Sequence, residues 1–150
     1  MQHDPISAQS MDFAALDSLA HAHIRTVDAL AGFEKLVDEA EPEFHATAAR
    51  FRNLHKAHAA VLARLLQQHG RAPDPDGSFM AGINRLVVAT RAFFDEIDAD
   101  VMDQVRSGEE HVLAAYRDAE SAVPFPVVKS SVAALRIELE ALLAETRDLA

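Results

Sequence analysis

Few helix-breaking residues interrupt this chain, since its 150 residues include only 5 Gly and 6 Pro. Between these breaks, apolar residues recur at the three- and four-residue spacing of one face of an α-helix. The stretch FRNLHKAHAAVLARLLQQHG, residues 51–70, shows this spacing and places His55 and His58 three residues apart on one helix. The sequence therefore predicts an all-α protein built from long helices, and it raises the question of what two neighbouring histidines do there.

Capping residues and prolines predict a first helical hairpin. Ser10 or Asp12 can cap a helix that runs to about Ala40, and Pro42 suits the first turn of the next helix. That second helix is expected to end at Gly70, because glycine is the usual residue just after a helix C-terminus. The connection between the two helices is short, so they should pack side by side.

A second hairpin is predicted in the C-terminal half. Asp98 can cap a helix over about 99–121, which the sequence VPFP then ends. Pro124 or Pro126 opens a last helix that runs to about Leu149. Another helix is expected over 79–94, within a connection of residues 71–97 that joins the two hairpins.

A connection of that length can travel along the whole bundle and let the third helix run parallel to the second. This is the one-crossover topology of ferritin-like bundles. The fold class predicted from the sequence is therefore an all-α, ferritin-like antiparallel four-helix bundle. It forms one domain over 1–150, with a helical crossover between helices two and three and a mobile terminus at 1–10.

Composition excludes several kinds of function. The chain has no Cys, which removes disulfides, thiolate metal sites and cysteine nucleophiles. Its formal net charge of -10 at pH 7 disfavours binding to nucleic acid or to anionic membrane surfaces. No signal peptide or membrane-spanning run is recognisable, so we expect a cytoplasmic protein.

A helical projection at about 100° per residue predicts which side chains face the core. The apolar face of the first helix is expected to comprise Leu16, Ala20, Val27, Leu30 and Ala31. The corresponding face of the third helix comprises Val101, Val105, Val112 and Tyr116, and that of the fourth includes Val128, Leu135, Leu139 and Leu142. Six polar side chains are expected on or at the edge of these inward faces: His23, Glu34, His55, His58, Glu109 and Glu138.

Levels counted from the two hairpin turns place His23, His58 and Glu109 in one layer of the core, with His55 and Glu138 beside it. In this projection His58 is central on its helix and His55 lies toward an edge. Buried imidazoles and carboxylates cost several kcal/mol unless they are paired, hydrogen-bonded or bound to metal. The layer therefore needs a chemical explanation.

The segments GFEKLVDEA, GRAPDPDGS and RSGEEHVLAAYRDAE, together with the proline-initiated last helix, resemble an uncharacterised bacterial branch of the ferritin-like four-helix proteins. A complete ferritin-like dimetal site takes a Glu from each of two helices and Glu-x-x-His from each of the others. The resemblance implies that His58 and Glu109 match this ligand set. His55 stands where the resemblance implies a Glu, and Glu138 stands where it implies the second His. The two remaining positions, where further carboxylates are implied, hold the apolar residues Val27 and Leu135.

Such a ligand set disfavours an enzyme with ferroxidase or oxygenase activity, because two irons need more anionic oxygen than Glu109 and Glu138 supply. A single divalent ion, zinc or iron, held by His58, His55, Glu109 and Glu138, with His23 nearby, is one remaining interpretation. The other is a metal-free polar layer, in which His58 and Glu109 hydrogen-bond to each other or to neighbouring hydroxyl groups, Tyr116 or Thr47, or to water.

Two function classes therefore stay open. One is a non-catalytic structural or interaction module that self-associates as a dimer, and the other is a single-metal protein of storage or stress protection. Phe93, Phe94 and the sequence RLVV are expected either to pack the crossover onto the bundle or to form the dimer face.

Overall fold

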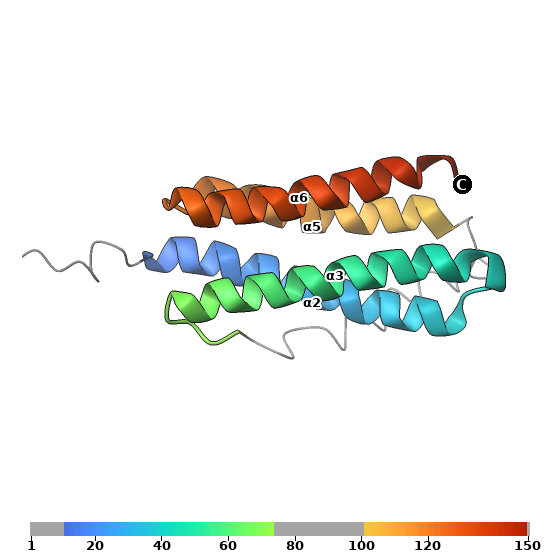
Figure 1. Cartoon of the computed structure of the whole chain (residues 1–150), viewed down its shortest axis with the longest axis horizontal. Coiled ribbons are helices and arrows are strands. Elements are labelled where there is room, and N and C mark those ends of the chain that lie inside the picture. Colours follow the sequence, from blue (N-terminus) through green and yellow to red (C-terminus); the bar gives the residue numbers. More distant parts are fainter. Residues whose placement is uncertain (1–10, 74–100, 150) are drawn as a thin grey trace, which may run out of the picture.

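The computed structural model describes residues 11–73 and 101–149. Within these ranges the chain forms α2 (Phe13–Glu39), α3 (Pro42–Gln68), α5 (Met102–Ala122), α6 (Pro126–Glu145) and a short 3-10 helix, η2 (Arg147–Leu149), with no strand. Figure 1 shows the four α-helices packed side by side. The prediction of an all-α four-helix bundle is confirmed for the described residues.

Several predictions fall outside the described residues. These are the mobile terminus at 1–10, the cap at Asp98, the helix at 79–94 and the apolar pair Phe93 and Phe94 within it. None of the helices described here is both long and apolar enough to cross a membrane.

Helix starts follow the predicted capping chemistry. The Asp12 side chain accepts a hydrogen bond of 2.8 Å from the backbone N–H of Ala15, so Asp12 caps α2. Pro42 and Pro126 stand in the first turns of α3 and α6, where their missing N–H groups leave no hydrogen bond unmade. The predicted starts of these three helices are therefore correct.

The end of α3 is also set by a residue that the sequence singles out. Gly70 has a φ of +83°, which lies in the left-handed region that glycine adopts without strain. The backbone then turns so that the N–H of Arg71 donates to the carbonyl of Leu66 at 2.9 Å. This pattern satisfies a carbonyl that the helix end would otherwise leave without a partner.

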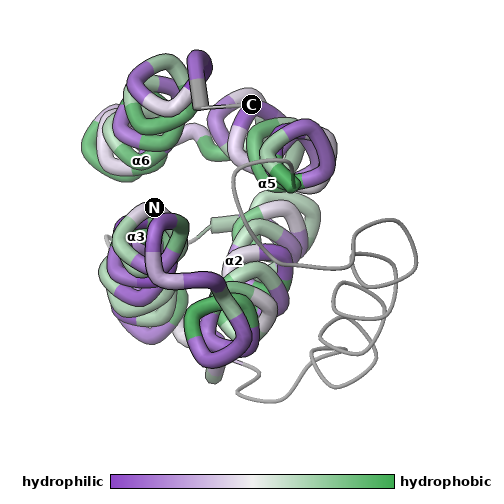
Figure 2. Tube along the Cα trace, turned by 90° about the vertical axis from the view of Figure 1, so that its right-hand side faces the viewer, coloured by the Kyte–Doolittle hydropathy of each residue, from purple (hydrophilic) through white to green (hydrophobic). Residues whose placement is uncertain are grey.

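The four helices are not packed equally tightly. α2 packs closely against α3 and also against α5, and α5 packs against α6, whereas α3 and α6 contact each other sparsely. Figure 2, a view turned by 90° from Figure 1, shows the α2–α3 and α5–α6 hairpins as two layers. The boundary between α3 and α6 is therefore the loosest seam of the described bundle.

Core faces match the prediction for α5 and α6 but not for α2. Val101, Val105, Val112 and Tyr116 are buried on or beside α5, and Val128, Leu135, Leu139 and Leu142 are buried on α6. On α2, the fully buried side chains include Ala15, Leu19, Ala22, Phe33 and Leu36.

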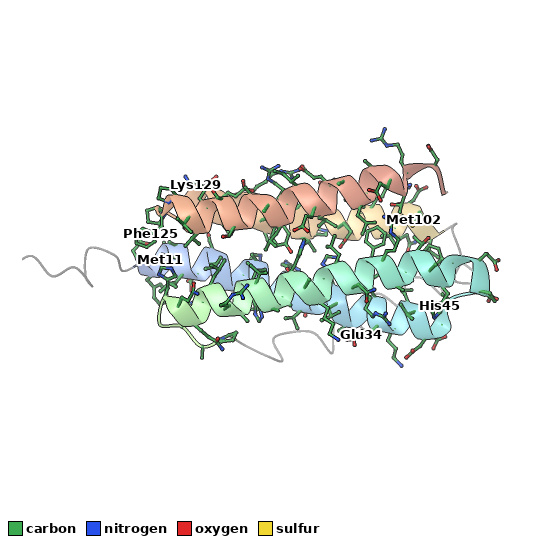
Figure 3. All side chains as sticks on the ribbon, viewed as in Figure 1. Met11, Glu34, His45, Met102, Phe125 and Lys129 are labelled. Atoms are coloured by element: carbon green, nitrogen blue, oxygen red, sulfur yellow. The ribbon has the colours of Figure 1, made fainter. Side chains whose placement is uncertain are left out.

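The face predicted for α2 was rotated by about one residue, since Leu16, Ala20, Val27 and Leu30 are only half-buried, and of the predicted face only Ala31 is buried. Glu34, predicted to face inward, is exposed, and Figure 3 shows it on the side of α2 away from α5 and α6. The physical reason is that α2 packs on both α3 and α5, so two directions are buried and a single apolar stripe does not define its inward side.

Candidate functional site

The centre of the polar layer is a direct contact between α3 and α5. His55 Nε2 donates to Glu109 Oε2 across 2.6 Å, and the two side chains are 0% and 2% exposed. The His55 ring also stacks on Phe33 of α2, with the ring centres 5.5 Å apart. The imidazole is thus held in place by an aromatic ring from one helix and a carboxylate from another.

A second set of contacts runs from His58 through Tyr116 to Thr26. His58 Nδ1 lies 3.1 Å from the Tyr116 hydroxyl oxygen, which lies 2.9 Å from Thr26 Oγ1. Thr26 Oγ1 in turn donates to the backbone carbonyl of Ala22 at 2.8 Å. These bonds join α3, α5 and α2 within the buried core.

Counting protons fixes the direction of each bond in this chain. The single hydroxyl proton of Thr26 goes to the Ala22 carbonyl, which can only accept. The Tyr116 hydroxyl must then donate to Thr26 and accept from His58, so His58 carries its proton on Nδ1. The other ring nitrogen, Nε2, therefore bears a lone pair when His58 is neutral.

That lone pair faces an acidic group. His58 Nε2 lies 3.4 Å from Oε1 of Glu138 on α6, and no described residue hydrogen-bonds to it. Burial, followed by the nearby charge of His55, lowers the pKa of His58 from 6.5 to about 4. His58 is thus neutral near pH 7, and two electron-rich atoms stand opposite each other.

Burial also changes the acidity of Tyr116. Its side chain has no exposed surface, and burial raises the pKa of the phenol, although the hydrogen bond with Thr26 acts in the opposite direction. Glu109 and Glu138 add to the rise, because a phenolate would be repelled by their negative charge. The hydroxyl therefore remains a proton donor at neutral pH, as the chain of bonds requires.

Among the described side chains of the layer, Glu138 is the one that reaches solvent. The Glu138 side chain is 62% exposed, whereas His58 beside it is 3% exposed. Beside Glu138, a shallow groove of about 420 Å³ follows the boundary between α3 and α6. A second shallow groove, of about 440 Å³, lies between α2 and α5 and does not include a residue of the layer. Arg50 of α3 and Glu145 of α6 form an ion pair across the boundary between α3 and α6.

The predicted site residues are only partly brought together. His23, His55, His58 and Glu109 are all buried, as expected. The hydrogen-bonded pair is His55 with Glu109, however, and not His58 with Glu109. His58 bonds instead to Tyr116, one of the partners that the sequence analysis named. His55, placed at an edge by projection, is in fact fully buried, whereas Glu138, placed at the edge of the inward face, is 62% exposed. In the described ranges, no three His, Asp or Glu side chains are grouped so that they could hold one metal ion.

Thr26 is the member of the layer that the sequence analysis missed. Thr47 was named as a possible hydroxyl partner, whereas Thr26 makes the contact with Tyr116. The signal was present, because counting levels from the hairpin turn puts Thr26 between the heights of His55 and His58. A threonine at that height, on an otherwise apolar face of the first helix, could therefore have been predicted to bond to a polar side chain of the layer.

Comparisons with known proteins give one match. A domain of unknown function, DUF2383, matches residues 14–121. This range includes α3 and nearly all of α2 and α5, and with them His55, His58, Glu109 and Tyr116. Searches of curated proteins and of solved structures returned no match.

Proposed function

The chain belongs to the DUF2383 family, and from this premise and the geometry of the layer we propose that it is a non-catalytic, ferritin-like helical module. The proposed topology is supported by the direction of the helices. In Figure 1 the sequence colours run one way along α2 and α6 and the opposite way along α3 and α5. A third helix parallel to the second is the arrangement of one-crossover bundles.

The observation that carries the non-catalytic proposal is the contact between His55 and Glu109. A dimetal centre needs carboxylates whose oxygens are available to the ions. Here the buried carboxylate on α5 accepts a hydrogen bond of 2.6 Å from an imidazole that is itself fully buried. The hydrogen bond joins α3 to α5 within the core and leaves only the other ring nitrogen of His55, Nδ1, without a partner among the described residues. A buried hydrogen bond between two helices is what a structural layer requires.

The role we propose for this layer is to fix how the helices fit together. Apolar side chains tolerate sliding, whereas a hydrogen bond between buried groups is lost if either helix shifts by one turn. His55 with Glu109 sets the position of α3 against α5, and the chain from His58 to Thr26 sets α3 and α5 against α2. Buried polar groups serve such a specificity role in some helical proteins.

A second candidate function is supported by a different observation, the 3.4 Å spacing of His58 Nε2 and Glu138 Oε1. Two ligands of one tetrahedral zinc ion are about 3.3 Å apart, since each lies about 2.0 to 2.1 Å from the metal. The lone pair and the carboxylate could hold a single divalent ion at the edge of the layer. His58 and Glu138 supply two donors, and water would have to complete the site.

Metal analysis distinguishes the two candidates. Protein purified without affinity tag or chelator is measured for zinc and iron, as wild type and as the double variants His58→Ala with Glu109→Ala and His58→Ala with Glu138→Ala. The matched control, His45→Ala with Glu110→Ala, removes an exposed histidine and an exposed glutamate.

Wild-type protein without stoichiometric metal, before and after incubation with zinc, supports the non-catalytic module. One ion per chain that is lost in the His58 variants and kept in the control overturns that proposal and establishes the metal candidate.

A further inference from the structure

The outward side of α6 carries large apolar side chains that none of the other described helices covers. Val127 and Ile137 are 78% and 56% exposed, and Phe13 is the other large apolar side chain exposed in the described ranges. Phe13 differs from them because the Arg71 guanidinium lies over its ring, 5.1 Å from the centre. Val127 and Ile137 share one helix, ten residues apart.

The residues between and beyond them form a continuous face. We use the name outer α6 face for Val127, Ser130, Ala134, Ile137, Ala141 and Ala144, which are all exposed. Their spacing of three and four residues places them along one side of the helix. None of the six carries a charge, and Figure 2 shows hydrophobic colour on the side of α6 away from the other helices. A solvated helix face normally carries charged residues.

We propose that the outer α6 face binds the same face of a second copy of this chain, antiparallel, about a twofold axis between Ala134 and Ile137. Size complementarity supports this register. Val127 lies opposite Ala144 of the partner subunit, and Ile137 lies opposite Ala134 of the partner subunit. Each large side chain thus meets a small one, which lets the two helices approach closely.

Charge complementarity supports the same register. Lys129 and Glu140 flank the outer α6 face on the same side, and a twofold axis brings that flank against itself. In this register position 129 is level with position 142 of the other copy, so Lys129 lies about 3 Å along the helix axis from Glu140 of the partner subunit. The long lysine side chain can span that offset. Figure 3 shows Lys129 on the first turns of α6, and it forms no ion pair with any described residue. Glu140 already pairs with Arg117 and Arg136 of its own chain, so Lys129 would join an existing cluster of charges.

The area of the outer α6 face indicates how strongly two copies of the chain would bind each other. A helix of 20 residues is about 30 Å long, and a strip about 10 Å wide along it buries about 300 Å² on each copy. Stable complexes bury about 800 Å² on each partner. The dimer should therefore be weak and depend on concentration. It goes beyond the proposed function, because the residues of the outer α6 face are not part of the polar layer.

Sedimentation velocity of the full chain over about 5 to 500 μM tests the proposal. Wild type should shift from monomer to dimer within this range, and Ala134→Glu, which puts a charge at the centre of the face, should raise the dissociation constant at least tenfold. The matched control is Ala60→Glu, an exposed alanine on α3, which should leave the dissociation constant unchanged. Helical circular dichroism confirms that both variants are folded.

Two results would overturn the proposal: wild type that stays monomeric at every concentration, or a dimer that Ala134→Glu does not weaken. Cross-linking gives an independent check, because the chain has no Cys. Ile137→Cys should give a covalent dimer with a short bis-maleimide, whereas Ala60→Cys should not. Equal cross-linking of the two variants would count against the proposed face.

Charge exchange tests the register itself. Lys129→Glu should weaken the dimer several-fold, and adding Glu140→Lys to the same chain should restore it. Glu140→Lys alone is the control, because this change also breaks the ion pairs of Glu140 with Arg117 and Arg136 of its own chain. A double variant that is weaker than Lys129→Glu alone would contradict the antiparallel register.

Discussion

His55 Nε2 and Glu109 Oε2 lie 2.6 Å apart at a place in the bundle where neither side chain is more than 2% exposed. Glu110, the next residue along α5, is exposed. One helical step therefore separates a carboxylate that joins two helices from one that is solvated. This difference gives the experiments below a matched internal control.

Removing one member of this pair should destabilise the fold. Glu109→Gln and His55→Gln are each expected to lower the free energy of unfolding by about 1 to 3 kcal/mol, because each leaves a buried partner poorly satisfied. The double variant should lose less than the sum of the two. Urea unfolding measures all three, and Glu110→Gln should change stability by less than about 0.5 kcal/mol. Additive losses would show that the two groups are not coupled.

Acid should destabilise the protein through His58. Its pKa is about 4 in the folded state against 6.5 when unperturbed, so between these values the unfolded chain binds more protons. Stability should thus fall as the pH drops from 6.5 toward 4, by about 3 kcal/mol at most. His58→Gln should flatten this slope, whereas His45→Gln, at an exposed site, should not. An NMR titration that places the pKa of His58 near 6.5 would contradict the prediction.

The only tyrosine gives a direct optical probe of the layer. The chain contains one Tyr and no Trp, so absorbance near 295 nm at alkaline pH reports Tyr116 alone. Because burial raises the pKa of this phenol, it should stay protonated above pH 10 for as long as the helices are intact. Ionisation should coincide with loss of helical circular dichroism. A titration near pH 10 in the folded protein would show that Tyr116 is accessible.

Tyr116→Phe tests the directions of the hydrogen bonds. The change removes the acceptor of His58 Nδ1 and the donor to Thr26, and it should cost about 1 to 3 kcal/mol in urea unfolding. Nitrogen-15 NMR of wild type should show His58 protonated on Nδ1, and the variant should lose this preference. His58 protonated on Nε2 in wild type would reverse the assignment. Thr47→Val, away from the chain of bonds, serves as the control.

The cap of α2 should make a smaller contribution. Asp12→Ala removes the acceptor that Ala15 N–H uses at 2.8 Å, and it should lower the free energy of unfolding by about 1 kcal/mol. Asp12→Ser, which keeps a capping oxygen, should recover most of this loss. Thermal unfolding with both variants provides the measurement, and equal stability of Asp12→Ala and wild type would refute the role of the cap.

Much of the fold follows from local features of the sequence. Asp12, Pro42, Gly70 and Pro126 act through backbone geometry within a few residues, so the starts and ends they set need no knowledge of the other helices. The inward faces of α5 and α6 were likewise correct. The face of α2 was not, because a helix with two close neighbours buries two sides.

The polar layer, like the fold, was predictable from the sequence only in part. Helical spacing alone determined that His58 and Glu109 would lie within the bundle, since burial of a residue depends mainly on the pattern around it on its own helix. The same spacing placed His55 at an edge, and only the structure shows it fully buried. Only the tertiary structure decided that Glu109 bonds to His55, and that His58 bonds to Tyr116, which in turn bonds to Thr26. A partner across the core depends on helix rotation and on shifts of about one residue, 1.5 Å along the axis. That is finer than hydrophobic periodicity can resolve, yet a shift of that size is enough to exchange one hydrogen-bonding partner for another.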